Sequence, residues 1–261
     1  MPIGHELTGE GRAAFGEYLL LMADDELVLG HRDSEWCAFA PLIEEDVAFA
    51  SIAQDEISHA ALFYELIESL RGLSRDQLAF GRPDTEMRNV TLVEQENSDW
   101  AFTVVRHYLY DLADDLRTEQ LLHSGEPLLR SIAERIRREE RYHLEHGAMW
   151  LHRLAHGGAE ARRRTQHAVD RVLLGCRGIF HPLAWEQVLV KEGLLPDRPS
   201  RLLPTFLSRA GAVLLENGLQ MPQMAAVAAG PCGRVGHHGP ELGRLLETMG
   251  EVWRTDPVAN W

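Results

Sequence analysis

The chain of 261 residues is 45% hydrophobic and carries a formal net charge of −14, from 26 Lys and Arg against 40 Asp and Glu. Its length fits one large domain or two small ones, with enough apolar residues for a sizeable core. The negative charge argues against a general binder of nucleic acid or of anionic membranes, so we expect no nucleic-acid or membrane partner.

Targeting and redox signals in the sequence indicate the cytoplasm. No run of 18 or more apolar residues occurs, and the stretch MPIGHELTGEGRAAFGEY has neither the basic start nor the apolar core of a signal peptide. The three cysteines, Cys37, Cys176 and Cys232, form no metal-binding pair and no disulfide framework, which is typical of a reducing compartment. We therefore expect a soluble, cytoplasmic protein.

Apolar residues recur at helical spacing in four long segments, whereas strand-like alternation is nearly absent. Pro41 and Pro127 suit the first turns of two of these segments, and the acidic run at 44–46 suits a helix N-terminus. The glycine pair at 157–158 ends the last segment. The expected helices cover about 9–30, 41–70, 97–123 and 127–154.

The four segments form two hairpins with short loops, joined by a long polar connection at about 71–89. That pattern predicts an all-α fold built on a four-helix bundle. The remainder of the chain is punctuated by Pro and Gly, and it predicts shorter, additional C-terminal helices. We expect a single domain over 1–261, with a core bundle at about 9–156 and a C-terminal helical extension at about 158–261.

Two Glu-x-x-His pairs fall on the apolar stripes of the second and fourth segments. The first is Glu56 with His59 in DEISHA, and the second is Glu140 with His143 in EERYH. Residues three apart share one face of a helix, so both pairs replace core residues. A buried carboxylate is costly unless it is paired or bound to a metal, and the repetition at symmetric positions favours a metal site.

Two such helices, together with one carboxylate from each of the other two, make up the ligand arrangement of ferritin-like di-iron bundles. In an antiparallel hairpin, residues at equal distances from the turn lie at one level. Glu26 lies 30 residues before Glu56, and Asp111 lies 29 residues before Glu140, so both are candidate ligands. The rival carboxylates are Asp114 and Asp115 on the third segment and, more weakly, Asp25 on the first.

The chemistry of a di-iron site needs these residue types. Carboxylates neutralise two iron ions about 3.5–4 Å apart, and neutral imidazoles leave positions open for dioxygen. Manganese accepts the same ligands, so a di-manganese or mixed site stays open. Asp55 and Glu139 each precede a ligand Glu, and we expect Asp55 to accept a hydrogen bond from His143 and Glu139 one from His59, across the bundle axis.

The other histidines and aromatics carry weaker signals. We expect His107 on a helix surface and His123 at a helix end. The aromatic side chains of Phe49, Phe63 and Trp100 suit the core rather than a pocket lining. A solvated helix face is expected for His146, His152 and His156, and a loop for His237 and His238.

Beyond these motifs, the chain resembles the ferritin-like subunits of phenylacetyl-CoA epoxidase, the multicomponent ring-oxygenating complex of phenylacetate catabolism. The resemblance is carried by residues 22–60, 99–116, 139–157 and 236–261, and thus covers nearly the whole chain. The flanking sequence is most similar to the non-catalytic subunit, which in the family has lost its iron ligands. The six candidate ligands instead match the catalytic pattern of a DExxH and an ExxH.

The resemblance implies a di-iron monooxygenase subunit that activates dioxygen to epoxidise an aromatic CoA thioester or a similar substrate. It also implies electrons from a separate reductase, contacts with other oxygenase subunits, and a homodimer or hetero-oligomer. The alternative is a non-catalytic scaffold subunit that docks the catalytic one. Iron storage or a di-manganese enzyme ranks last, because about 100 residues follow the bundle. The arginines of 161–171 suit a solvated face, with a CoA-phosphate site as the alternative.

Overall fold

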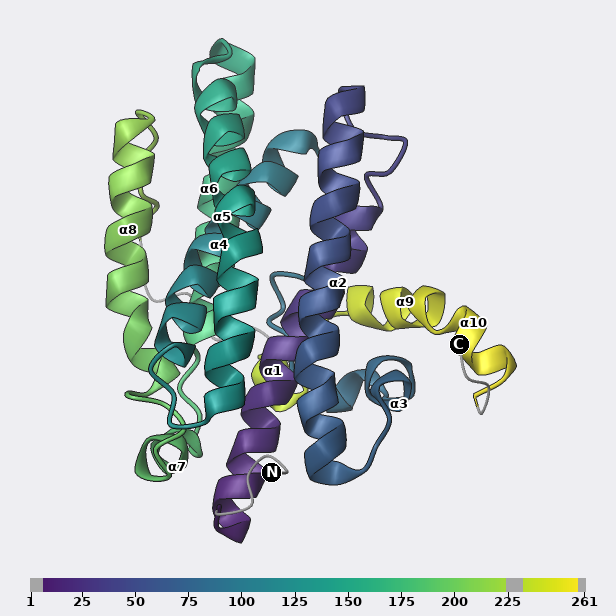
Figure 1. The fold of residues 1–261 in the computed structure, drawn as a ribbon. Helices are drawn as coiled ribbons and strands as arrows, with labels where there is room; N and C mark the ends of the chain where they lie inside the picture. The colour runs from purple at the N-terminus through teal and green to yellow at the C-terminus, as the bar shows by residue number, and fades with distance from the viewer. Residues whose placement is uncertain (1–6, 224–231, 258–261) are drawn as a thin grey trace.

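The computed structural model describes residues 7–223 and 232–257, and no strand is present within these two ranges. The expected all-α fold and its four long helices are confirmed, and they lie as two hairpins (Figure 1). These helices are α1 (Gly9–Ser34), α2 (Ile43–Arg71), α4 (Trp100–Leu121) and α5 (Pro127–His156).

Side-chain caps mark where α1 and α4 begin. The Thr8 hydroxyl accepts a hydrogen bond from the Gly11 amide at 2.9 Å, and the Asp99 carboxylate accepts one from the Phe102 amide at 2.9 Å. Pro127 is the first residue of α5, as the sequence predicts. The prediction for Pro41 is wrong: Leu42 is the N-cap with an extended backbone, φ −142° and ψ 152°, so the proline lies outside α2.

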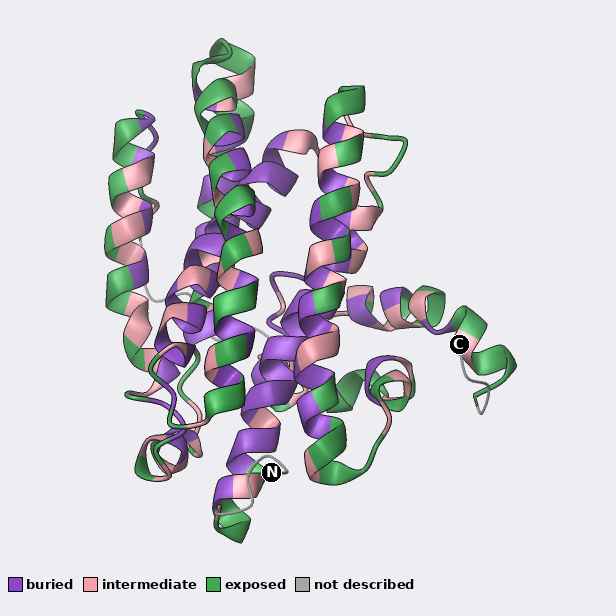
Figure 2. Cartoon of the chain, in the orientation of Figure 1, coloured by how far each residue is buried: buried purple, intermediate pink, exposed green. Residues whose placement is uncertain are grey.

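The connection between the hairpins is longer than expected and covers one side of α1. It runs from residue 72 to residue 99 and contains α3 (Arg75–Phe80) and the 3₁₀ turn η1 (Asp84–Glu86). Its backbone amides at Arg88 and Val90 donate to the carboxylates of Asp24 and Asp25, each at 2.7 Å. Acidic residues of α1 can therefore be buried, and α1 is buried almost all round (Figure 2).

The C-terminal helices pack against the outside of the bundle. The helix α6 (Ala159–Cys176) lies against α4 and α5, α7 (Glu186–Lys191) against α1, and α8 (Leu203–Glu216) against α4. The helix α9 (Pro240–Met249) lies against η1 and leads into α10 (Glu251–Thr255). The remaining short turns are η2 (Arg177–Phe180), η3 (Pro199–Leu202) and η4 (Gly233–Val235). Within the described ranges, no helix combines the length and the apolar character that a membrane span requires.

Two apolar clusters fill the interior and leave a polar level between them on α5. One cluster includes Ile136 of α5, together with the first half of α1 and the second half of α2. The other includes Leu151 of α5, together with much of α4 and α6. Glu140 and His143 lie between these two residues and belong to neither cluster.

Gly30 allows α1 to approach α2 closely at this level, and its replacement by Ala is expected to destabilise the protein. A Cβ there would meet Ile57 Cγ1 at 2.9 Å, Glu56 Cβ at 3.0 Å and the Ala53 carbonyl oxygen at 3.1 Å. Overpacking typically costs about 1–3 kcal/mol, which exceeds the gain of about 1 kcal/mol in helix propensity. Urea unfolding measures the difference. In the control Gly243→Ala, a Cβ meets nothing within 4 Å, and the same substitution should be neutral or stabilising.

Candidate metal centre

Five of the six candidate ligands meet in the interior of the bundle. Glu26 comes from α1, Glu56 and His59 from α2, and Glu140 and His143 from α5, and none is more than 2% exposed. His59 is central to the first group. Its Nδ1 lies 3.6 Å from Glu26 Oε2, 3.5 Å from Glu140 Oε1 and 3.9 Å from Glu56 Oε2. One ligand atom from each of these four residues lies within 4.8 Å of the other three, which is a spacing that one cation can bridge.

A second group of potential ligands adjoins the first. His143 Nδ1 lies 3.4 Å from Glu56 Oε1 and 3.2 Å from Glu140 Oε1. Atoms of Glu56, His107 and His143 also lie within 4.8 Å of one another. Glu56 therefore belongs to both groups, and Glu140 lies close to both imidazoles, as a carboxylate shared between two metal ions would.

The buried atoms that face one another have no hydrogen-bond partners among the described residues. Both carboxylate oxygens of Glu56 are in this state, as are Nδ1 of His59, Nδ1 of His143 and Oε2 of Glu26. Glu140 also has an unpartnered oxygen, Oε2, while its Oε1 is the oxygen nearer to both imidazoles. An unsatisfied buried polar group costs about 1–3 kcal/mol, so a protein rarely gathers several without a ligand for them. The donor set of carboxylates and imidazoles suits iron or manganese. The residues present therefore fit a pair of such ions.

Crowded carboxylates shift the pKa values inside the site in opposite directions. Burial raises the pKa of Glu56 well above its usual range, and the charges of Glu26 and Glu140 add to this. Burial alone would raise the pKa of Glu26 too, but the neighbouring side chains of Glu56 and His59 and the charge of Arg117 outweigh it and hold that pKa at about 2. For His59, burial is outweighed by Glu26 and Glu140, which raise the pKa to about 9. The field in the site therefore favours positive charge.

The outer nitrogens of both imidazoles face carboxylates from across the bundle. His59 Nε2 lies 2.8 Å from Glu139 Oε2, and His143 Nε2 lies 3.3 Å from Asp55 Oδ2. These are the two pairs that the sequence predicts. The carboxylates are about one-third exposed, at 33% and 35% of the side chain, so they connect the buried rings with the surface of the bundle.

Asp111 lies at the edge of the site rather than within either compact group. It is fully buried, its Oδ2 is 3.2 Å from His107 Nε2, and neither of its oxygens has a hydrogen-bond partner in the part of the chain that the structure describes. Burial raises its pKa to about 8, against the lowering effect of His107, and the charge of Glu140 adds to the rise. Its role as a metal ligand stays a prediction.

The rival carboxylates are held by arginines instead. Arg117 donates to Asp25 at 2.6 Å and to Asp114 at 2.6 Å. Asp25 also accepts from Arg234 at 2.7 Å, and Asp115 lies 2.9 Å from both Arg137 and Arg209. These ion pairs occupy both oxygens of Asp25 and of Asp115, which makes the two residues poor candidates for ligands. Asp114 is paired through Oδ1 alone, and its buried Oδ2 has no hydrogen-bond partner among the described residues, but it belongs to neither compact ligand group.

Two histidines that the sequence predicts to be exposed, His107 and His146, are buried. His107 is 1% exposed rather than on a surface, because α4 is covered by α5, α6 and α8 on several sides, and its Nδ1 lies 3.0 Å from Asp33 Oδ2. His146 is 8% exposed rather than solvated, and its Nε2 lies 2.7 Å from Glu45 Oε2. The expected exposure is found for His152 and His156, the loop position for His237 and His238, and the helix-end position for His123.

Two further residues adjoin the centre. The Tyr110 hydroxyl donates to Glu26 Oε1 at 2.9 Å and accepts from Arg117 at 2.7 Å. Phe49 is 1% exposed, as expected for the core, and its ring centroid lies 5.7 Å from those of both His107 and His146. The alignment with Glu140 marks Asp111, and the spacing of four residues between His107 and Asp111 is the sequence signal that could have added His107 to the α4 side of the site.

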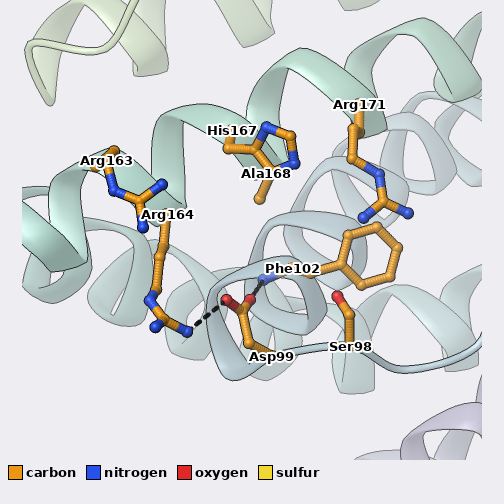
Figure 3. Close-up of a pocket in the computed structure, with 8 residues that line it drawn as sticks. All are labelled: Ser98, Asp99, Phe102, Arg163, Arg164, His167, Ala168 and Arg171. Carbon is orange, nitrogen blue, oxygen red and sulfur yellow. Dashed lines mark hydrogen bonds and ion pairs between the residues drawn. The ribbon is translucent and has the colours of Figure 1, made fainter.

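A pocket of about 280 Å³ lies on the outer surface between the start of α4 and α6, and it contains none of the candidate ligands (Figure 3). The Arg163 and Arg164 guanidinium groups both donate to Glu160 at 2.8 Å, and Arg164 also reaches Asp99 at 3.2 Å. Arg171 lies over the Phe102 ring at 4.7 Å. These arginines have acidic partners or an aromatic contact within the chain, as the expected solvated face would.

Comparison with known proteins identifies the family. Residues 5–261 match the family described as phenylacetic acid catabolic protein. The chain is 32% identical, over 245 residues, to one of the subunits of the 1,2-phenylacetyl-CoA epoxidase of Escherichia coli (strain K12). That match covers 94% of this chain and 98% of the relative. The all-α bundle is therefore the ferritin-like fold of these proteins, and the chain belongs to the phenylacetic acid catabolic protein family.

Proposed function

We propose that this chain is a metal-binding, oxygen-activating subunit of the phenylacetate-catabolic type. The proposed metal ligands are the six predicted residues, Glu26, Glu56, His59, Asp111, Glu140 and His143. The observation that carries the proposal is the buried array of carboxylates and imidazoles whose facing atoms have no other partner among the described residues. When bound, a pair of iron ions supplies the redox chemistry that activates dioxygen.

The chain's own residues would position the metals and keep water out. Glu56 and Glu140 each lie near both imidazoles and so suit bridging positions. Tyr110 holds one oxygen of Glu26 and leaves the other directed toward His59. Buried apolar side chains next to the ligands, including Phe49, Ile52 and Ala60, exclude bulk solvent, which strengthens electrostatic interactions in the site.

The substrate class and the partners follow from the relative. Its name supports an aromatic CoA thioester as the substrate and epoxidation as the reaction. It is also one subunit of its enzyme, which supports other oxygenase subunits as partners. The chain has three cysteines and no Gly-rich dinucleotide motif, so we infer that electrons come from a separate reductase.

A scaffold function is the competing proposal. The relative is one subunit of its enzyme. The resemblance of the flanking sequence to the non-catalytic subunit favours a chain that docks a catalytic homologue. The buried ligand set opposes this, because a site without metal would retain several costly unsatisfied groups for no function.

Metal analysis after expression in iron-replete medium separates the two proposals. We expect two iron ions per chain and dioxygen uptake that requires both phenylacetyl-CoA and a reductase. Manganese in place of iron would change the metal but keep the site. A purified chain free of both metals would leave the scaffold function.

Replacing Asp55 by Ala is expected to weaken metal binding about 10–100-fold, as is usual when the outer partner of a ligating histidine is lost. The reason is that Asp55 fixes the orientation of His143 through Nε2. Titration with Mn²⁺ under anaerobic conditions measures the affinity. Glu65→Ala removes an exposed carboxylate from the same helix and should leave the affinity unchanged. Unaltered metal binding in Asp55→Ala would show that this carboxylate does not position the ring.

A further inference from the structure

We propose that His107 is a further metal ligand, held in place by Asp33, so that the second ion is bound by two imidazoles, His107 and His143, together with Glu56. The inference rests on the proposed metal-binding function and adds a residue outside the two Glu-x-x-His pairs. It makes the two halves of the site chemically different.

The position of His107 carries the inference. An atom of its ring lies within 4.8 Å of ligand atoms of both Glu56 and His143, in a group as compact as the one around His59. All three residues of this group are buried, at 0–1% exposure. The ring centroids of His107 and His143 are 5.8 Å apart, and the rings are inclined by 47° rather than stacked.

Asp33 supplies the second part of a carboxylate–histidine–metal arrangement. This carboxylate comes from α1 and is fully buried, and its Oδ2 lies 3.0 Å from His107 Nδ1, although neither atom has a hydrogen-bond partner in well-aligned geometry among the described residues. A small rotation of the ring would direct the Nδ1 proton at Asp33, and a neutral ring would then present the Nε2 lone pair to the interior of the bundle. Ligating histidines are commonly fixed in this way, with the carboxylate setting both the tautomer and the ring orientation.

The inner side of the ring faces groups that need a positive charge. Its Nε2 lies 3.2 Å from Asp111 Oδ2, and both Asp111 oxygens and both Glu56 oxygens are buried without hydrogen-bond partners in the described ranges. A neutral imidazole has one N–H, so it cannot donate to Asp33 and Asp111 together. A cation beside Nε2 would lie in the group that the ring forms with Glu56 and His143, and would bring a positive charge close to Asp111. A doubly protonated ring that only bridges Asp33 and Asp111 is the competing arrangement.

The inference predicts two unequal metal positions. The compact group around His59 contains one imidazole, whereas the group around His107 contains two, from His107 and His143, so the second position is richer in nitrogen even with Asp111 and Glu140 close to it. Nitrogen ligands favour the later divalent metals of the first row over manganese. The His107 position should therefore prefer Co²⁺ over Mn²⁺ more strongly than the His59 position does.

Equilibrium dialysis of the full chain with Co²⁺, under anaerobic conditions, tests the assignment. We expect two Co²⁺ per chain in the unmodified protein, and in His107→Gln one ion at unchanged affinity with the second weakened at least about 100-fold. Asp33→Asn should weaken the same ion about 10-fold. His146→Gln is the matched control, because His146 is also buried, paired with a carboxylate and 5.7 Å from the Phe49 ring, yet lies outside both ligand groups.

The outcomes separate this inference from the proposed function. Two Co²⁺ bound by His107→Gln with the affinities of the unmodified protein would overturn the assignment. The competing arrangement would then hold, in which a doubly protonated His107 ring bridges Asp33 and Asp111. An unmodified chain that binds no Co²⁺ would overturn the proposed function as well. If His107→Gln does not fold, anomalous diffraction from Co²⁺-loaded crystals of the unmodified protein decides the matter, by the presence or absence of a Co²⁺ ion at coordination distance from His107 Nε2.

Discussion

Replacing Glu56 by Gln is expected to abolish binding of both metal ions while preserving the metal-free fold. The Glu56 oxygens face His59 on one side and His143 on the other, and Glu56 belongs to both compact ligand groups. An amide is a much weaker ligand than a carboxylate and brings no negative charge to offset the metal charge. We expect less than about one-tenth of the metal content of the unmodified protein, and a loss of oxygenase activity of at least about 100-fold, since each ion needs this bridge.

Retention of the fold has a separate electrostatic reason. Burial and the charges of Glu26 and Glu140 raise the pKa of Glu56, so the metal-free chain already favours the neutral form of this side chain. Glutamine has the shape of that neutral form. The metal-free variant should therefore unfold at the same urea concentration as the metal-free parent, or at a slightly higher one.

Thermal unfolding with and without Mn²⁺ measures both effects in one experiment. A metal that binds only the folded state at 100 times its Kd stabilises it by about 2.7 kcal/mol, so the parent should show a clear rise in Tm. The variant should show none. Glu45→Gln is the control, because Glu45 is a buried carboxylate of the same helix that pairs with His146 instead. A Glu56→Gln chain that still binds two metals would refute the shared position of Glu56.

The parts of the site that lie within one helix or one hairpin could be predicted from the sequence. Each Glu-x-x-His pair is fixed by helical spacing alone, and Glu26 is aligned with Glu56 by the short α1–α2 loop. The cross-bundle pairs of Asp55 with His143 and of Glu139 with His59 follow from the same symmetry.

The α4 side of the site could not be predicted with the same accuracy. Nearly every residue of α4 is buried, because α5, α6 and α8 all lie against it. Apolar periodicity then no longer distinguishes the face toward the bundle centre from the other faces. The alignment with Glu140 selects Asp111, whereas the structure places His107, one turn earlier, in a compact ligand group and Asp111 beside it.

The buried ion pairs next to Glu26, which join Asp25 to Arg117 and Arg234, could not be predicted from the sequence either. Arg234 binds Asp25 although the two residues are 209 positions apart in the chain, and Arg117 binds Asp25 across 92 positions. No local spacing predicts such contacts. In the sequence alone, a buried aspartate whose partners are distant arginines therefore cannot be distinguished from a metal ligand.

Replacing Arg117 by Met is expected to destabilise the protein by about 3–5 kcal/mol, the usual cost of removing one partner from a buried ion pair. Arg117 is 1% exposed and donates to Asp25, to Asp114 and to the Tyr110 hydroxyl, at 2.6–2.7 Å. Its loss deprives Asp114 of its ion-pair partner and leaves Asp25 with Arg234. Urea unfolding of the metal-free protein measures the loss without a contribution from metal binding.

Two further variants identify charge imbalance, rather than lost volume, as the cause. Arg209→Met on α8 removes an arginine whose side chain is 40% exposed and pairs with Asp115 and Glu119, so it should cost no more than about 1 kcal/mol. In the double variant Arg117→Met with Asp114→Leu, the unpaired carboxylate is gone as well, and a substantial part of the stability should return because a well-packed apolar pair can replace a buried ion pair. If the free energy of unfolding of the single Arg117→Met variant falls by less than about 1 kcal/mol, water must reach the carboxylates of Asp25 and Asp114. The neighbouring metal centre would then lack the dry interior that the proposed oxygen chemistry requires.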